Sequence, residues 1–427
     1  MNSFMRQSLG IVVATLGLIF LPEVASPQAF ISGSTGADGA FNPACGSVPC
    51  TFTVDLKQKT SGIFNYTTVN IPSGVTVNFT RNLSNAPVTM LATGDVTIAG
   101  TIDVRGSNAQ GGIPGRGGPG GFDGGLGGAD LGVPSNGSPG LGPGGGEGGR
   151  LNTGIYPGYG AGGGFSAPGA SNGPVLGGPS YGTHTLFPLI GGSGGGGGIS
   201  LTAFSGPGGG GGGGGILIAS TGTISLIDGV ISADGGLDSY FSDGTNGVYS
   251  GCGSGGAIRL VANTIVASGF AQLRALGGLG SNCFLGSSDG RIRIESFQLL
   301  GSISYARSFS PSIGLPGPVL PGANSPVVLI TSIGGQSVPA TPQASYFGTP
   351  DVTLSPSVPN PIPVQLQANN VPLGTAIAVT VVTEGIGTRS TFTSSPLVGT
   401  LASSAATVYV HLPTGTSVLT ATATFMP

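Results

Sequence analysis

Aspartates and arginines are the residues of this sequence with the clearest chemical potential, since charged residues make up only 7% of it. Two carboxylates about 5 to 10 Å apart could serve as the acid and base of a polysaccharide hydrolase or lyase. Aspartates in Gly/Ser-rich turns usually cap their own backbone, and we expect no aromatic cluster beside them for stacking on sugar rings. A structural role is therefore favoured, with the enzyme as the alternative. The catalytic candidates in that alternative are Asp228, Asp234, Asp238 and Asp243.

Arginines are the candidates for binding an anionic ligand. Arg259 and Arg293 align at the outward position of two successive apolar runs, which places them about 4.8 Å apart if the runs pair in parallel. They would repel each other unless an anion lay nearby. Asp289 and Glu295 can supply it in a salt-bridge ladder, the favoured interpretation, and a carboxylated glycan could supply it instead. Further donors to such a glycan would be Arg274 and Arg291.

Metal and nucleotide sites receive little support from the motifs. The tandem heptads "GGPGGFD" and "GGLGGAD" resemble calcium-binding G-G-x-G-x-D repeats, but Asp123 and Asp130 come one residue late. The histidines, His184 and His411, are far from any cysteine. A chance G-x-G-x-x-G lacks the strand and helix that a nucleotide site needs. We expect no cofactor and no metal, with those two aspartates as the calcium alternative.

Composition excludes two classes of partner. With 13 Lys and Arg against 16 Asp and Glu, the chain has no basic surface for nucleic acid. No internal stretch approaches 18 unbroken apolar residues, so we expect no membrane span in the mature chain.

The first 29 residues predict an export signal. Arg6 precedes the apolar core "LGIVVATLGLIFL", and small residues follow it, which places cleavage between about residues 26 and 31. Export predicts an extracellular or cell-surface protein, with the periplasm as a further option, and makes disulfides possible. The expected pairs are Cys45–Cys50 and Cys252–Cys283.

Four segments of the chain can be laid over one another, each with short runs of alternating apolar and polar residues. They are "VTMLATGDVTIAGTIDVRG", "ILIASTGTISLIDGVISADGG", "IRLVANTIVASGFAQLRALGG" and "IRIESFQLLGSISYARS", starting at Val88, Ile216, Ile258 and Ile292. Such self-similarity is typical of stacked coils in which each unit covers its neighbour's apolar face. We therefore expect an all-β protein with a parallel β-helix, or β-solenoid, in residues 30–106 and 214–312. A pair of β-sandwiches is the alternative.

Residues 107–213 form a Gly-rich insertion between the first and second copies. Ordering glycine gains little, so we favour a flexible loop over glycine segments packed as polyproline II helices. A Pro-rich linker at 313–324 then leads to residues 325–427, where about seven candidate strands, among them "PDVTLSPS", predict an immunoglobulin-like β-sandwich.

The "GDVTIAGTIDVRG" type of coil in a Gly-rich exported chain resembles the β-helical shafts of filamentous-haemagglutinin-like adhesins, over residues 62–106 and 214–306. The resemblance implies adhesion and carries over no functional residue. We expect a non-enzymatic structural or adhesive protein whose partners are extracellular polysaccharide or other surface proteins, with the polysaccharide-active enzyme as the alternative.

Overall fold

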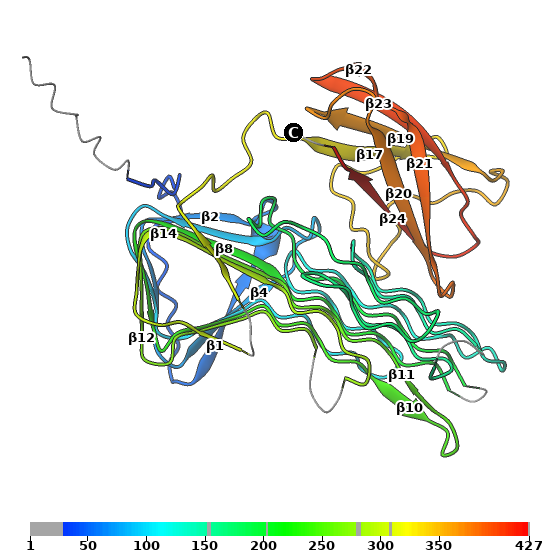
Figure 1. The fold of residues 1–427 in the computed structure, drawn as a ribbon, viewed down its shortest axis with the longest axis horizontal. Coiled ribbons are helices and arrows are strands. Elements are labelled where there is room, and N and C mark those ends of the chain that lie inside the picture. Colours follow the sequence, from blue (N-terminus) through cyan, green and yellow to red (C-terminus); the bar gives the residue numbers. More distant parts are fainter. Residues whose placement is uncertain (1–28, 152–154, 202–203, 279–282, 307–309, 426–427) are drawn as a thin grey trace, which may run out of the picture.

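The regular structure of the protein is all-β, in a computed structural model (Figure 1). Its only helix among the described residues is the short 3-10 turn η1 (Leu56–Gln58). No helix in that part of the chain is long and apolar enough to cross a membrane. The described residues are 29–151, 155–201, 204–278, 283–306 and 310–425.

Two parallel sheets organise the chain from residue 50 to residue 314, and the chain passes from one to the other in each repeat. The first sheet contains, in spatial order, β16 (Ser312–Gly314), β14 (Arg291–Leu300), β12 (Ala257–Ser268), β8 (Gly215–Ile227), β5 (Val88–Ala92) and β2 (Ile63–Tyr66), with β6 (Val96–Ile98) also on β8 and β3 (Val69–Ile71) on β6. The second contains β1 (Cys50–Asp55), β4 (Val75–Thr80), β7 (Thr101–Asp103), β9 (Val230–Ser232), β13 (Gln272–Arg274) and β15 (Ser304–Tyr305).

The strand register matches the alignment of the sequence repeats. Val88 pairs with Ile216, Ile216 with Ile258, and Ile258 with Ile292. All four are buried in one core that the two sheets share. Because side chains alternate along a strand, this register turns every second residue of each copy into the core, and the predicted apolar rows are confirmed.

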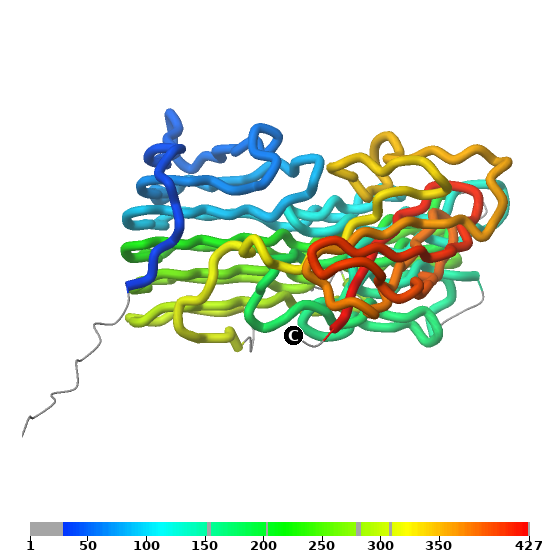
Figure 2. The backbone as a smooth tube through the Cα atoms, turned by 90° about the horizontal axis from the view of Figure 1, so that it is seen from above, coloured from blue at the N-terminus to red at the C-terminus, as the bar shows by residue number. Residues whose placement is uncertain are grey.

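The segment that precedes β1 crosses the repeats instead of adding to them. The amide of Asn263 holds both the N–H and the C=O of Phe30, Ser32 donates to the carbonyl of Ala92, and Ser34 donates to that of Tyr66. In Figure 2 this segment runs across the stacked strands at one end of the molecule. It therefore ties together repeats that are adjacent in space but distant in sequence.

The Gly-rich residues are packed, so the prediction of a flexible loop is wrong. Residues 106–214 form backbone hydrogen bonds with segments 234–256 and 276–290. We call the described residues of these three segments the glycine array, which extends beyond the two sheets as wavy segments in Figure 1. At its centre, residues 191–200 form backbone hydrogen bonds with six other segments. These are 120–128, 135–141, 146–149, 158–161, 207–213 and 251–254.

Hydrogen bonds in the glycine array recur every third residue. Across one interface the donor and acceptor pairs are Gly192–Gly213, Gly195–Gly210 and Gly198–Pro207. Three residues per turn is the repeat of a polyproline II helix, the alternative that the sequence left open. With three residues per turn, donors can point in three directions, which lets one segment bond to several neighbours.

Close backbone approach explains why these positions are glycine. A Cβ on Gly163 would lie 2.6 Å from the carbonyl oxygen of Ser193, and one on Gly191 would lie 2.7 Å from that of Gly213. No side chain tolerates such contacts, so the array forms only because the Cβ is missing. Hydrogen bonding and van der Waals packing between the segments offset the backbone entropy that was expected to keep this region disordered.

The C-terminal residues form two antiparallel sheets around a core of their own. One sheet contains β18 (Gln336–Ser337), β17 (Val327–Ile333), β19 (Ile362–Asn369), β23 (Ser403–Val410) and β22 (Val398–Thr400), and the other β21 (Arg389–Pro396), β20 (Ala376–Thr383) and β24 (Ser417–Ala423). The stretch "PDVTLSPS" is not a strand, because prolines flank it and the Asp351 carboxylate accepts the N–H groups of Gln343 and Ala344. Arg389 donates to the carbonyls of Gly142 and Gly145, which fixes these sheets on the glycine array.

Candidate functional site

A cleft of about 830 Å³ lies where the second parallel sheet meets the glycine array, and we call it the arginine cleft. Its volume is within the range of small-molecule and oligosaccharide pockets. Residues at and beyond the ends of β4, β7, β9 and β13 form one side, and residues of the glycine array form the other. The charged lining residues are Arg81, Arg105, Arg116, Arg274, Asp103 and Asp234.

Parallel pairing places polar side chains in one row that crosses the sheet. Asn78 pairs with Asp103, Asp103 with Ser232, and Ser232 with Arg274, and Thr53 extends the row beyond Asn78. Neighbouring strands are about 4.8 Å apart, so the row spans about 19 Å. Asn78, Asp103 and Arg274 of this row line the cleft, whereas Ser232 is 5% exposed. An extended polymer with a polar group on each unit could contact those three side chains at once.

The arginines of the cleft differ in how far carboxylates neutralise them. Arg105 binds both oxygens of Asp103, and these hydrogen bonds raise the pKa of the guanidinium. Arg81 forms an ion pair with the buried Asp123. Arg116 is exposed and lies over the ring of Phe347 at 4.3 Å, with no ion pair to any residue that the structure describes. Arg116 is therefore the arginine most available to an anionic ligand.

Asp234 and Arg274, both predicted from sequence, meet in this cleft. Their side chains form an ion pair at 2.8 Å, and Asp234 also accepts the N–H of Leu276. These contacts engage both oxygens of the carboxylate and hold it in one orientation. This arrangement suits ligand positioning better than proton transfer.

The remaining predicted arginines lie elsewhere. Arg259 aligns with Leu217 and Arg293 and points away from the shared core as predicted, but it is covered at 3% exposure and therefore does not face a ligand. Glu295 binds both arginines, and Pro318 of the linker accepts from Arg259. Burial opposes ionisation of Glu295, but the arginine hydrogen bonds outweigh it and lower its pKa.

Arg291 lies at a separate, smaller recess of about 300 Å³ near His184. Its guanidinium donates to the carbonyl of Tyr181 and lies over the ring of Phe165. Burial lowers the pKa of Arg291. Arg291 therefore does not join Arg274 in one binding site.

Each of the predicted catalytic aspartates has a partner in the structure. Asp228 occupies a turn at φ 57° and accepts the N–H of Phe270, and Asp243 caps the turn at Thr245 and Asn246. Asp238 lies beside the Cys252–Cys283 disulfide. Of the four, Asp243 alone caps its own turn, whereas Asp228, Asp234 and Asp238 accept N–H groups from segments distant in sequence, at Phe270, Leu276 and Phe284. Within the described chain no hydrogen bond joins two of these carboxylates.

Asp123 and Asp130, the calcium candidates, also have local partners. Asp123 is 1% exposed and accepts from Gly117 and Ser345 in addition to its ion pair with Arg81. Asp130 is exposed and accepts the N–H of Gly132. Neither belongs to a group of three potential metal ligands in the described part of the chain.

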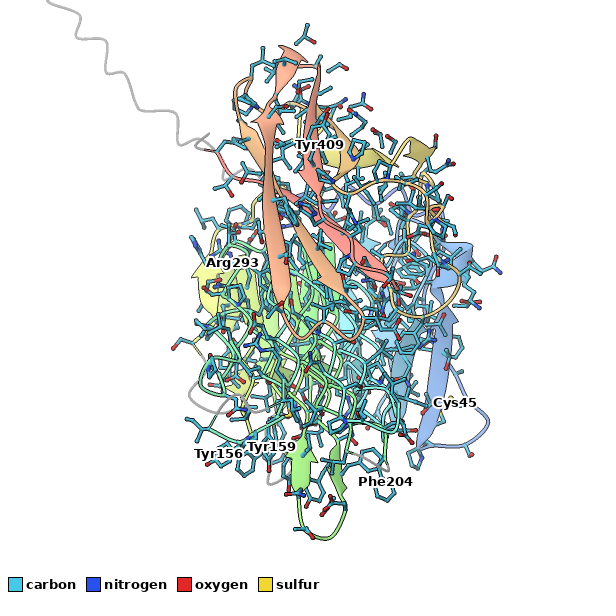
Figure 3. All side chains as sticks on the ribbon, turned by 90° about the vertical axis from the view of Figure 1, so that its right-hand side faces the viewer. Cys45, Tyr156, Tyr159, Phe204, Arg293 and Tyr409 are labelled. Atoms are coloured by element: carbon cyan, nitrogen blue, oxygen red, sulfur yellow. A yellow bond between two sulfur atoms is a disulfide. The ribbon has the colours of Figure 1, made fainter. Side chains whose placement is uncertain are left out.

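An aromatic cluster does lie beside one of the aspartates, so the expectation of none was wrong. Phe284 donates its N–H to Asp238 and contacts Tyr156, Tyr159 and Tyr249. The members of this cluster come from three segments distant in sequence, one of which ends in a short strand, and Figure 3 shows Tyr156 and Tyr159 at the end of the molecule away from Tyr409. Because the segments are distant in sequence, only the packing of the array could have indicated the cluster.

Arg81, Arg105 and Arg116 were not predicted from the sequence. Arg81 and Arg105 follow strands of the same parallel sheet, in the stretches "NFTRN" and "IDVRG", and Arg274 belongs to the matching stretch "AQLRALGG". Ends of parallel strands meet at one edge of a sheet, so aligning these stretches would have grouped the three. Arg116 stands alone among glycines and gave no such signal.

Comparison with known proteins adds no relative: no family model, curated protein or solved structure matches the chain. The function is therefore inferred from the geometry of the cleft.

Proposed function

We propose that this protein is an exported, non-enzymatic structural or adhesive surface protein that binds carboxylated extracellular polysaccharide in the arginine cleft. We further propose that its parallel sheets are the coils of a β-helix and that its C-terminal sheets form an immunoglobulin-like sandwich. Two disulfides, Cys45–Cys50 and Cys252–Cys283, support export. A rigid stack held by cross-repeat contacts suits a protein that presents a binding surface.

The observation that carries the proposal is the set of arginines beside an in-register polar row. Carboxylates are bound best by guanidinium groups, which offer paired N–H donors. Arg116 has no carboxylate partner within the described chain, and Arg105 is 55% exposed in its side chain. A polyuronate could thus bind Arg116 directly and compete with Asp103 for Arg105.

Binding of polygalacturonate tests the proposal. We expect Arg116→Gln to weaken binding about tenfold, since a charge-assisted hydrogen bond contributes about 1.5 to 3 kcal/mol. Lys57→Gln is the matched control, because it removes one exposed positive charge outside the cleft. Equal affinity of the two variants would contradict the assignment of the cleft.

The enzyme alternative is tested in the same samples by counting new reducing or unsaturated chain ends. We expect none to form. Cleavage by the natural protein that is lost when Asp228, Asp234, Asp238 and Asp243 are all replaced by Asn would establish the enzyme instead.

A further inference from the structure

Five aromatic side chains gather near one end of the glycine array, and we call them the aromatic platform: Tyr156, Tyr159, Tyr240, Tyr249 and Phe284. Tyr240 and Tyr249 face each other across the hairpin of β10 (Tyr240–Ser242) and β11 (Gly247–Tyr249), with ring centroids 4.4 Å apart. Phe284 stacks on Tyr249 at 5.1 Å. Tyr240, Tyr249 and Phe284 therefore form a short column of rings.

Tyr156 and Tyr159 complete the platform. They stack on each other at 5.4 Å and meet the ring of Phe284 edge-on. The rings at the margins are well exposed, with Tyr156 at 41% and Tyr240 at 49%. The platform thus presents aromatic surface to solvent.

The four tyrosine hydroxyls form no hydrogen bond to another residue in the described chain. Burial, and secondarily the phenols of the neighbouring platform tyrosines, raise the pKa of Tyr159. The platform therefore offers two kinds of contact side by side: ring faces for an apolar partner and free hydroxyls for a polar one.

Charge is scarce at the platform. No Lys or Arg of the described chain lies over any of its rings, in contrast to Arg116 and Phe347 at the cleft. Burial raises the pKa of Asp238 to about 7, so a large share of this carboxyl is neutral at physiological pH. These conditions favour a ligand without charge.

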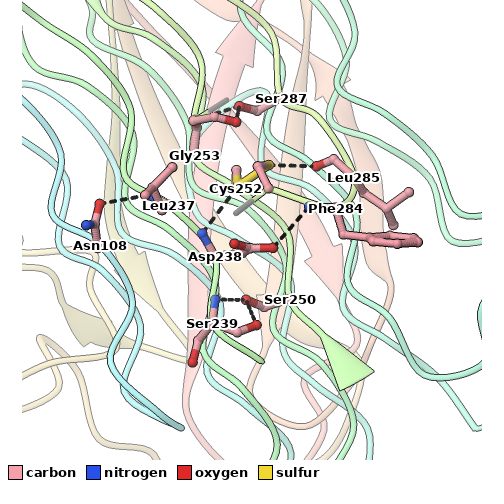
Figure 4. Close-up of a disulfide and its surroundings, with 12 residues drawn as sticks. Asn108, Leu237, Asp238, Ser239, Ser250, Cys252, Gly253, Phe284, Leu285 and Ser287 are labelled. Atoms are coloured by element: carbon pink, nitrogen blue, oxygen red, sulfur yellow. Dashed lines mark hydrogen bonds between the residues drawn. A yellow bond between two sulfur atoms is a disulfide. The ribbon is translucent and has the colours of Figure 1, made fainter. Parts of the chain in front are cut away.

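The disulfide and Asp238 hold the platform together (Figure 4). Cys283 precedes Phe284 and is bonded to Cys252, three residues beyond Tyr249. The carboxylate of Asp238 accepts the N–H of Phe284, and the backbone N–H of Asp238 donates to the sulfur of Cys252. The rings are therefore positioned before any ligand arrives, which reduces the entropy cost of binding.

We propose that the aromatic platform is a second glycan-binding site, which takes uncharged sugar rings. The C–H face of a pyranose ring packs on an aromatic face, and its hydroxyls bond to groups at the rim. The proposal rests on the proposed function in that it makes the protein a binder of extracellular polysaccharide. It differs in the ligand, because the arginine cleft takes a carboxylated sugar.

The test compares soluble neutral polysaccharides, a glucan, a mannan and a galactan, with polygalacturonate. We expect the natural protein to bind at least one neutral polymer. Tyr240→Ala and Tyr156→Ala should each weaken that binding about tenfold, the equivalent of an aromatic contact of about 1.4 kcal/mol. Tyr240→Phe, which retains the ring, should weaken it less, and Tyr409→Ala, which removes a tyrosine 62% exposed on the C-terminal sheets, should leave it unchanged.

Polygalacturonate binding reports on both folding and the separate site. The platform variants should keep it within about twofold, whereas Arg116→Gln should reduce it and leave neutral binding intact. The platform proposal would be overturned if the natural protein bound no neutral polymer. It would also be overturned if the Tyr156→Ala and Tyr240→Ala double variant bound a neutral polymer as tightly as the natural protein. If the natural protein bound a neutral polymer but not polygalacturonate, that result would instead count against the cleft.

Discussion

Replacing Gly196 with alanine tests whether the glycine array is a packed structure. The new Cβ would lie 2.5 Å from the carbonyl carbon of Glu147 and closer still to its oxygen. Ordinary contact begins at 3.4 Å, so the neighbouring segment would have to move by more than about 1 Å. Gly196 donates to the carbonyl of Ala161 and Ala161 donates to the carbonyl of Glu147, so moving Gly196 and Glu147 apart would weaken these two hydrogen bonds.

Overpacking costs about 1 to 3 kcal/mol, and each weakened hydrogen bond adds about 0.5 to 1.5 kcal/mol. We therefore expect Gly196→Ala to lower the free energy of unfolding by about 2 to 6 kcal/mol in urea titrations followed by circular dichroism. Gly322→Ala is the control, because nothing lies within 4 Å of its Cβ, and it should change stability by less than about 0.5 kcal/mol. If the two variants were equally stable, the packed array would be refuted.

Three further predictions concern burial, pH and processing. Glu295→Gln should cost about 3 to 5 kcal/mol in the same titration, since it leaves two poorly exposed arginines without their carboxylate, whereas Arg105→Gln breaks an exposed pair and should cost less than about 1 kcal/mol. Because the pKa of Asp238 is raised to about 7 in the folded protein, the contribution of Asp238 to stability is full below about pH 4 and is lost as the pH rises through 7. The stability of Asp238→Asn should not show that decline, and identical pH profiles of the variant and the natural protein would contradict the raised pKa. N-terminal sequencing of exported protein should find a start between about residues 26 and 31, and an intact Met1 outside the cytoplasm would contradict an export signal.

The parallel sheets could be predicted from the sequence because their cause is local. Alternation in each copy sets which side chains are buried, and in-phase repeats set the register from Val88 to Ile292. The Cys252–Cys283 pair followed from the same stack, since both cysteines precede successive copies. Little long-range information was needed for either prediction.

The glycine array was mispredicted because its stabilisation is entirely non-local. A single glycine segment gains nothing until several neighbours surround it, as they do around residues 191–200. A usable signal was present: glycine stands at every third position from Gly112 to Gly127, the repeat of a polyproline II helix. The seven-residue repeat "GGPGGFD" and "GGLGGAD" lies in the same stretch and made the three-residue repeat of glycine hard to recognise.

The residues of the two proposed binding sites also differ in whether a local sequence pattern could predict their positions. Arg274 and Asp234 could be predicted to face one region because they lie on or just beyond neighbouring parallel strands. The linker that buries Arg259 and the loops that bring Tyr156, Tyr240 and Phe284 together depend on chain paths that no local pattern encodes.

Titration of the purified mature protein with polygalacturonate, repeated at increasing salt while new chain ends are counted, tests the central claim most directly. We expect saturable binding that weakens as salt screens the arginines of the cleft, with the polymer recovered intact. Absence of binding, binding indifferent to salt and to Arg116→Gln, or release of shortened polymer would contradict it.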